Sequence, residues 1–151
     1  PETVVFQGAQ NVVTTLDLPA GAIDQSTVLA YADAPAPTAP SGFEFAGASF
    51  EITALQGGVI LDNLVFLEPV VLTLQYDDTG MTMAEELTLI IKYWDENTSQ
   101  WIDAAQTCNP LSIYVRDTVG NELSVPICHL SQYALFEKTL PKIYLPVLFK
   151  R

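Results

Sequence analysis

The sequence has few basic residues, one histidine and two cysteines, and each shortage argues against a class of function. Six Lys and Arg residues stand against 18 Asp and Glu residues in a chain of 151, so the formal net charge is −12. A protein this acidic repels phosphate backbones, which argues against nucleic-acid binding. No run of about 18 apolar residues exists, so no transmembrane segment is predicted. One histidine with two cysteines is too few for a convincing zinc site.

The residues that are abundant favour β-structure. The chain is 49% hydrophobic and only 16% charged, and ten prolines and eight glycines separate short apolar runs. This pattern predicts an all-β protein with an Ig-like sandwich of two antiparallel sheets. The length suits one domain. We expect an N-terminal extended segment at 1–11, the sandwich domain at 12–136 and a C-terminal apolar strand at 137–151.

Alternating apolar residues locate the strands. The clearest strand covers 70–76, where every second residue is apolar, and a further strand is predicted over 87–93 after at most one helical turn. In the segment 43–54 the apolar residues occupy odd positions before Gly47 and even positions after it, which predicts a β-bulge or bend. The three prolines of 33–40 predict an exposed loop.

Cys108 and Cys128 fit a single disulfide and hence an oxidising compartment, with two buried free thiols as the alternative. A hairpin centred on Thr118 would place Cys108 opposite Cys128 and Ile113 opposite Leu123. The same register would also place Leu111 opposite Val125. A bridge closing a loop of this size contributes roughly 3 kcal/mol.

Candidate catalytic and binding groups have simpler structural explanations. His129, the single histidine, is expected to serve packing and hydrogen bonding, because a general base also needs a nucleophile and an orienting group. Calcium ligands are conceivable in the turns at 77–78, 95–97 and 117–122, although none has the spacing of a known calcium loop. We predict no catalytic residue, no cofactor and no metal. The aromatic residues that could form a sugar platform, but are more readily divided between the core and cross-strand pairs, are Tyr76, Tyr93, Trp94 and Trp101.

The carboxyl-terminal ten residues carry an apolar stripe. In an extended chain Ile143, Leu145, Val147 and Phe149 point to one side, and such a stripe must be covered by its own sheet or by that of another copy. Residues 138–151 also carry four basic residues and no acid, whereas 1–137 carry 18 acidic against two basic residues. This asymmetry favours a head-to-tail contact, although the charges could simply keep an apolar tail in solution. An anchoring or sorting signal is a further alternative.

Four runs in order resemble a ZU5-like extracellular β-sandwich domain over roughly residues 12–136. They are Leu16–Ala22, Leu67–Leu74, Leu87–Asp95 leading to Trp101, and His129–Phe136. The run Ile143–Leu148 separately resembles the Tyr-Leu-Pro-rich tail of secreted Chloroflexota-type bacterial proteins. The resemblance implies a folding or interaction module without catalytic residues.

Together these features predict a secreted structural subunit that is not an enzyme. Copies of the chain would polymerise head to tail by β-strand donation from the 143–149 stripe into an extracellular, pilus-like filament or surface assembly. The alternative is a monomeric cell-surface binding or adhesion module, whose ligand, a glycan or another surface group, the sequence does not identify. The chain begins at Pro1 without a methionine or a signal-like segment, from which we expect a mature form whose signal peptide has been removed.

Overall fold

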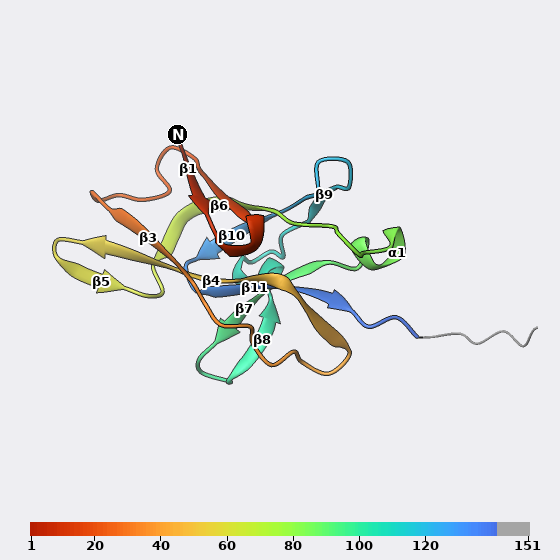
Figure 1. The fold of residues 1–151 in the computed structure, drawn as a ribbon. Helices are drawn as coiled ribbons and strands as arrows, with labels where there is room; N and C mark the ends of the chain where they lie inside the picture. Colours follow the sequence, from red (N-terminus) through yellow and green to blue (C-terminus); the bar gives the residue numbers. More distant parts are fainter. Residues whose placement is uncertain (142–151) are drawn as a thin grey trace, which may run out of the picture.

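Two antiparallel β-sheets pack face to face in the computed structural model, which describes residues 1–141 (Figure 1). The predicted all-β, two-sheet sandwich is therefore confirmed. The expected assembly strand with Ile143, Leu145, Val147 and Phe149 lies outside the described residues.

The first sheet has the spatial order β1-β2-β6-β10-β9. Its strands are β1 (Glu2–Gln7), β2 (Val13–Leu18), β6 (Val65–Gln75), β10 (Glu122–His129) and β9 (Val115–Asp117). The second sheet has the order β3-β4-β11-β7-β8, and β5 also pairs with β4. Its strands are β3 (Val28–Asp33), β4 (Phe43–Gln56), β5 (Val59–Leu61), β11 (Gln132–Lys138), β7 (Ile90–Asp95) and β8 (Gln100–Asp103).

The helical elements are single turns: η1 (Ala9–Asn11), α1 (Met83–Glu86) and η2 (Ala104–Thr107). Among residues 1–141, no helix has the length and apolar character needed to cross a membrane. Figure 1 shows α1 and β5 at opposite ends of the sandwich.

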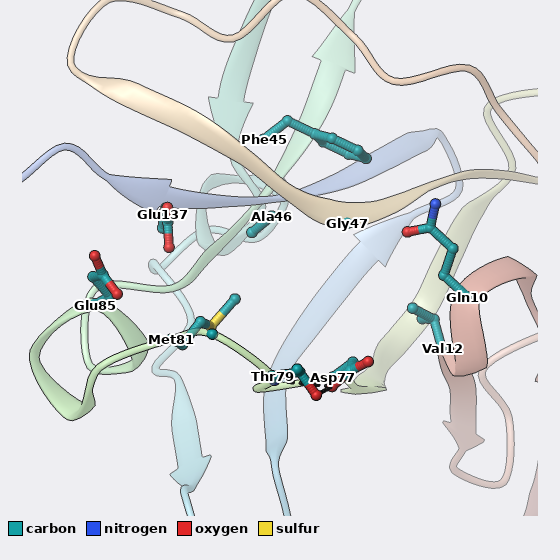
Figure 2. A pocket seen from close by; sticks show the side chains of 11 residues that line it. Gln10, Val12, Phe45, Ala46, Gly47, Asp77, Thr79, Met81, Glu85 and Glu137 are labelled. Carbon is teal, nitrogen blue, oxygen red and sulfur yellow. Dashed lines mark hydrogen bonds between the residues drawn. The ribbon is translucent and has the colours of Figure 1, made fainter.

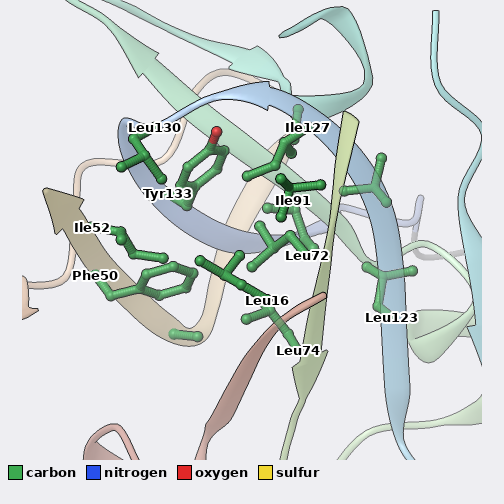
Figure 3. Packing of buried hydrophobic residues seen from close by; sticks show 14 of the residues in the cluster. Leu16, Phe50, Ile52, Leu72, Leu74, Ile91, Leu123, Ile127, Leu130 and Tyr133 are labelled. Atoms are coloured by element: carbon green, nitrogen blue, oxygen red, sulfur yellow. The ribbon is translucent and has the colours of Figure 1, made fainter. Parts of the chain in front are cut away.

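The core lies between the sheets and is built from the alternating positions of the sequence. Val70, Leu72 and Leu74 of β6 are fully buried, as expected from their period of two. They face Phe50, Tyr133 and the other large buried side chains of the second sheet (Figure 3). This alternation explains why the segment forms a strand: every second side chain from Phe66 to Leu74, except Glu68, is apolar and buried in the core, and the side chains between them, among them exposed Val65 and Leu67, face outward.

The predicted irregularity in β4 is present. Ser49 pairs with Ala134 of β11, but Phe136 of the same strand pairs with Phe45, so four steps along β4 oppose two along β11. Gly47 lies inside this stretch with φ +96°, a conformation that L side chains rarely adopt. This shift of two residues conserves parity. The apolar positions change parity because Phe45 packs against Phe136 on one face of the sheet, whereas Phe50 and Ile52 face the core from the other.

Residues 1–11, expected as a separate extended segment, contribute β1 to the first sheet through antiparallel pairing with β2. The ring of Phe6 stacks on Tyr31 of β3 at a centroid distance of 5.1 Å, and Tyr31 stacks on Phe50 at 5.2 Å. This aromatic row joins the β1 margin of one sheet to the second sheet.

The register of the cystine hairpin differs from the prediction. Leu123 pairs with Arg116 and Glu122 with Asp117, so the hairpin turns between 117 and 122 rather than about Thr118. The Asp117 carboxylate accepts hydrogen bonds from the backbone N–H groups of Val119 and Gly120 and so fixes this longer turn. The expected pairings of Ile113 and Leu111 are therefore wrong: these side chains are 81% and 67% exposed.

The segment 111–113 does not pair with β10 because it packs on η2, where Ser112 N–H donates to the carbonyl of Ala105 at 3.1 Å. The disulfide Cys108–Cys128 is nevertheless formed and joins the end of η2 to β10. The predicted cysteine pairing is therefore correct, although the hairpin register from which it was predicted is not.

The strand expected over 87–93 begins later, at Ile90. Thr82 caps α1 in a reciprocal capping box with Glu85, so the chain remains helical until Glu86. Leu87 is the C-cap of this turn and is 54% exposed, whereas Leu89 and Ile91 are buried as expected.

Candidate interaction site

Half of the long strand β4 lacks a partner on one edge. Strand β3 pairs with β4 from Leu55 to Phe50, and the last backbone hydrogen bond on this edge runs from Ala34 N–H to the Ser49 carbonyl at 2.8 Å. Among the described residues no strand pairs with 43–48 on this side. The cause is in the sequence: after Asp33 the chain carries three prolines within 35–40, and a proline cannot donate to a sheet ladder.

A cleft of about 370 Å³ lies beside this unpaired stretch. Segments far apart in the sequence form its walls: the η1 region, the bulge of β4, the loop after β6, α1 and β11 (Figure 2). Its apolar lining comes mainly from Phe45, Ala46 and Met81, all of which are half-buried. The ring of Phe45 packs edge-on against Phe136 at 6.4 Å, on the side of β4 opposite Ala46 and Met81 (Figure 2).

Three carboxylates, those of Asp77, Glu85 and Glu137, line the same cleft, and none of its lining residues is basic. In Figure 2 the side chains of Glu85 and Glu137 lie on one side of the cleft and that of Gln10 on the other. A recess with apolar walls and a purely acidic rim suits an apolar ligand that carries positive charge.

Local hydrogen bonds hold two of these carboxylates. The Glu85 side chain accepts from Thr82 N–H at 2.8 Å as part of the capping box of α1. Asp77 accepts from the hydroxyl of Thr79 at 2.6 Å and from its N–H at 2.9 Å, and these bonds lower the pKa of Asp77. Both groups are therefore positioned by the turns in which they lie.

The pKa of Glu137, on β11, is shifted in the opposite direction to that of Asp77. Burial raises the pKa of its carboxyl group, and repulsion from Glu85 and a hydrogen bond with Glu44 act in the same direction. Glu44 is the cross-strand neighbour of Glu137 in the β4–β11 ladder. The fold thus places like charges together at this end of the sandwich, at some cost in stability.

The four aromatic residues considered for a sugar platform do not share one surface. Tyr76 is buried, and its hydroxyl donates to Glu86 at 2.6 Å, an arrangement that together with burial raises the Tyr76 pKa. Trp94 and Trp101 form a cross-strand pair at 5.5 Å, and Trp101 also packs on Phe136. The division between core and cross-strand pairs is confirmed.

Tyr93 and Trp94 still line a second hollow of about 420 Å³, together with polar groups that include Asn63, Asp95 and His129. The His129 ring packs edge-on against Tyr93 at 5.0 Å, and its Nδ1 lies 3.0 Å from the Leu130 carbonyl. These contacts agree with the packing and hydrogen-bonding role expected for His129.

The acidic turns considered for calcium use their carboxylates to hold their own backbones. Asp95 accepts from Asn97 N–H and from the Thr98 hydroxyl, as Asp77 and Asp117 do in their own turns. Within residues 1–141, no group of three or more His, Cys, Asp or Glu side chains is arranged to hold a metal ion.

Comparisons with known proteins give no relative. No family model matches the chain. Searches of curated proteins and of solved structures find no match either. The resemblance to ZU5-like domains and to the Chloroflexota-type tail stays a prediction, and function must be argued from the site itself.

Proposed function

We propose that the protein is a non-enzymatic structural subunit of an extracellular filament or surface assembly, in which each copy donates its carboxyl-terminal strand to the next. The observation that supports this proposal best is the unpaired edge of β4 at 43–48, because an open sheet edge is a template for a strand from another chain. The disulfide is consistent with an oxidising, extracellular location.

The sequence supplies the matching donor. Ile143, Leu145, Val147 and Phe149 need cover, and β-strand addition provides both backbone hydrogen bonds and burial. When a segment of one copy fills a groove in the next, the contact is heterologous, and it generates a filament if the rotation does not close.

A substitution in the full chain tests the proposal. Replacing Ile143, Leu145, Val147 and Phe149 by serine should abolish assembly, measured by light scattering and by electron microscopy of negatively stained protein, and should leave a monomer. Replacing Tyr144 and Leu148 by serine is the matched control, because these residues point to the other side of an extended segment and should be tolerated. Removal of residues 142–151 should act like the fourfold variant. Normal polymers from the fourfold variant would refute strand donation by this stripe.

The hollow beside Tyr93 and Trp94 favours a second candidate, a monomeric adhesion module that binds a surface glycan. Aromatic faces together with amide and carboxylate groups are suited to sugar recognition. In that case the purified protein would be monomeric, and binding to an immobilised panel of oligosaccharides would fall on changing Asn63, an exposed member of the hollow, to alanine.

A further inference from the structure

We infer that the acceptor site is the open edge of β4 at 43–48 with its adjoining cleft, and that its occupant is residues 142–151 of a second copy, running antiparallel to β4. This inference rests on the proposed function and adds to it the location of the acceptor and the direction of the donated strand.

The lengths agree. Six residues of unpaired β4 extend over about 20 Å at roughly 3.3 Å per residue, and the seven residues from Ile143 to Phe149 extend over about 23 Å. Pro146 is compatible with such pairing. The odd-numbered residues of an extended segment direct their N–H groups to one side, so Pro146 would face away from β4, where no donor is needed.

The side chains are also complementary. The apolar residues of the stripe would meet Ala46 and Met81 in the cleft. Three bases flank the stripe: Lys142 precedes it and Lys150 and Arg151 follow it. In the antiparallel direction the two terminal bases reach the Phe43 end of the edge, where Glu44 and Glu137 are cross-strand neighbours. Opposite charges of this kind select partner and direction.

A buried hydroxyl beside the cleft adds an independent indication. Ser49 is only 7% exposed, and its Oγ has no hydrogen-bond partner among the described residues. It lines a recess of about 110 Å³ that shares Gln10, Phe45 and Gly47 with the cleft. A buried polar atom without a partner is costly, and a backbone group of an incoming strand would satisfy it.

The direction of the chain argues for a second copy over the protein's own tail. β11 lies on one side of β4 and the open edge on the other, and β11 ends beside the start of β4. Thr139 is still bound to the β11 side through its N–H to the Gly42 carbonyl at 2.9 Å. The protein's own tail leaves the sheet at the Phe43 end of β4, so along the open edge it would run parallel to β4. Lys150 and Arg151 would then lie away from Glu44 and Glu137, whereas a tail from a second copy can approach in the antiparallel direction.

A charge exchange in the full chain tests the assignment. Glu44→Lys with Glu137→Lys should raise the protein concentration needed for assembly at least about tenfold, as measured by light scattering at low salt. Lys150→Glu with Arg151→Glu should act similarly, and a chain with all four changes should regain assembly. The matched control is Glu51→Lys with Glu122→Lys, which makes the same charge change at exposed positions of β4 and β10 and should assemble like the parent. Thermal unfolding by circular dichroism checks that each variant is folded.

The outcomes separate the two proposals. The acceptor assignment is overturned, while strand donation stands, if the serine-substituted tail abolishes assembly but the Glu44 and Glu137 variant assembles like the parent. The same holds if the chain with all four charge changes does not regain assembly. Loss of assembly on changing Ile113 to glutamate, with the cleft variants unaffected, would assign the acceptor instead to the exposed apolar residues Leu111, Ile113 and Val115, the last of which begins β9. A parent chain that remains monomeric would overturn both.

Discussion

Two margins of the sandwich differ in how they are held. At the disulfide margin, which comprises η2, β8 and β9, the bond Cys108–Cys128 and a set of hydrogen bonds join the elements. Thr107 Oγ1 donates to the Ala104 carbonyl at 2.8 Å and accepts from Cys128 N–H at 3.1 Å. The Tyr114 hydroxyl lies 2.7 Å from both the Ile91 carbonyl and an Asp103 carboxylate oxygen.

The cleft margin, which comprises 43–48 of β4, α1 and the end of β11, has an unpaired strand edge and neighbouring carboxylates. β8 and β9 are edge strands as well, but their margin is held by a covalent bond and side-chain hydrogen bonds, whereas the cleft margin combines an unpaired stretch of β4 with like charges. Binding surfaces are commonly found in such less stabilised regions, because a surface that must accept a partner cannot satisfy all of its own groups first. This contrast supports the placement of the acceptor at the cleft margin.

The largest expected effect comes from the disulfide margin. Changing Cys108 and Cys128 together to alanine should lower the free energy of unfolding by about 3 kcal/mol, because the bridge closes a loop with a sequence separation of 20 and restricts the unfolded chain. Guanidinium unfolding measures the change, and reduction of the parent protein should reproduce it. The concentration required for assembly should hardly change while the variant is folded. A stability loss well below about 1 kcal/mol would mean that this margin does not depend on its covalent link.

The Tyr114 hydroxyl, at the same margin, should contribute less to the free energy of unfolding than the disulfide does. Tyr114→Phe should cost about 1–2 kcal/mol, because it leaves the Ile91 carbonyl and the Asp103 carboxylate without their hydroxyl partner. Tyr31→Phe is the matched control: its hydroxyl donates to exposed Asp33 at a longer distance, 3.3 Å, so its loss should be smaller. Equal losses in urea unfolding of the two variants would contradict the special role of Tyr114.

The sequence predicts individual strands and turns better than it predicts which of them lie side by side in the fold. The period-two runs of β2, β4 and β6 identify strands because burial of one sheet face directly requires that pattern. The bulge expected near Gly47 is also present, although its shift of two residues does not itself change the parity of the apolar positions. The hairpin register fails because the Asp117 turn chemistry and the contact of Ser112 with η2 override the apolar match.

The cleft could not be predicted, because its lining side chains come from segments as distant in sequence as Gln10, Asp77 and Glu137, and only the sheet order brings them together. Two signals nevertheless exist in the sequence. The prolines of 35–40 imply that a strand stops early, and Thr82 with Glu85 is a capping-box pattern that fixes a carboxylate on a turn. Neither signal indicates that the unpaired edge of β4 and the Glu85 carboxylate border the same cleft.

The smallest expected effect lies at the cleft margin and depends on pH. Burial, with Glu85 and Glu44 nearby, raises the pKa of Glu137 above its ordinary value, so the folded protein disfavours the ionised form. Below the ordinary pKa of a glutamate the group is neutral in both states and costs nothing. As the pH rises through the elevated folded pKa, the unfolded chain loses its proton more readily and stability falls.

Glu137→Gln should therefore raise the Tm at pH 7, by a small amount on the order of 1 °C because the group is partly solvated, and the gain should disappear in acid below the ordinary glutamate range. Scanning calorimetry at a series of pH values measures this difference, and Glu122→Gln, at an exposed position of β10, controls for the change in net charge. A gain for Glu137→Gln that persists unchanged into acid would show that repulsion among the cleft carboxylates is not its source.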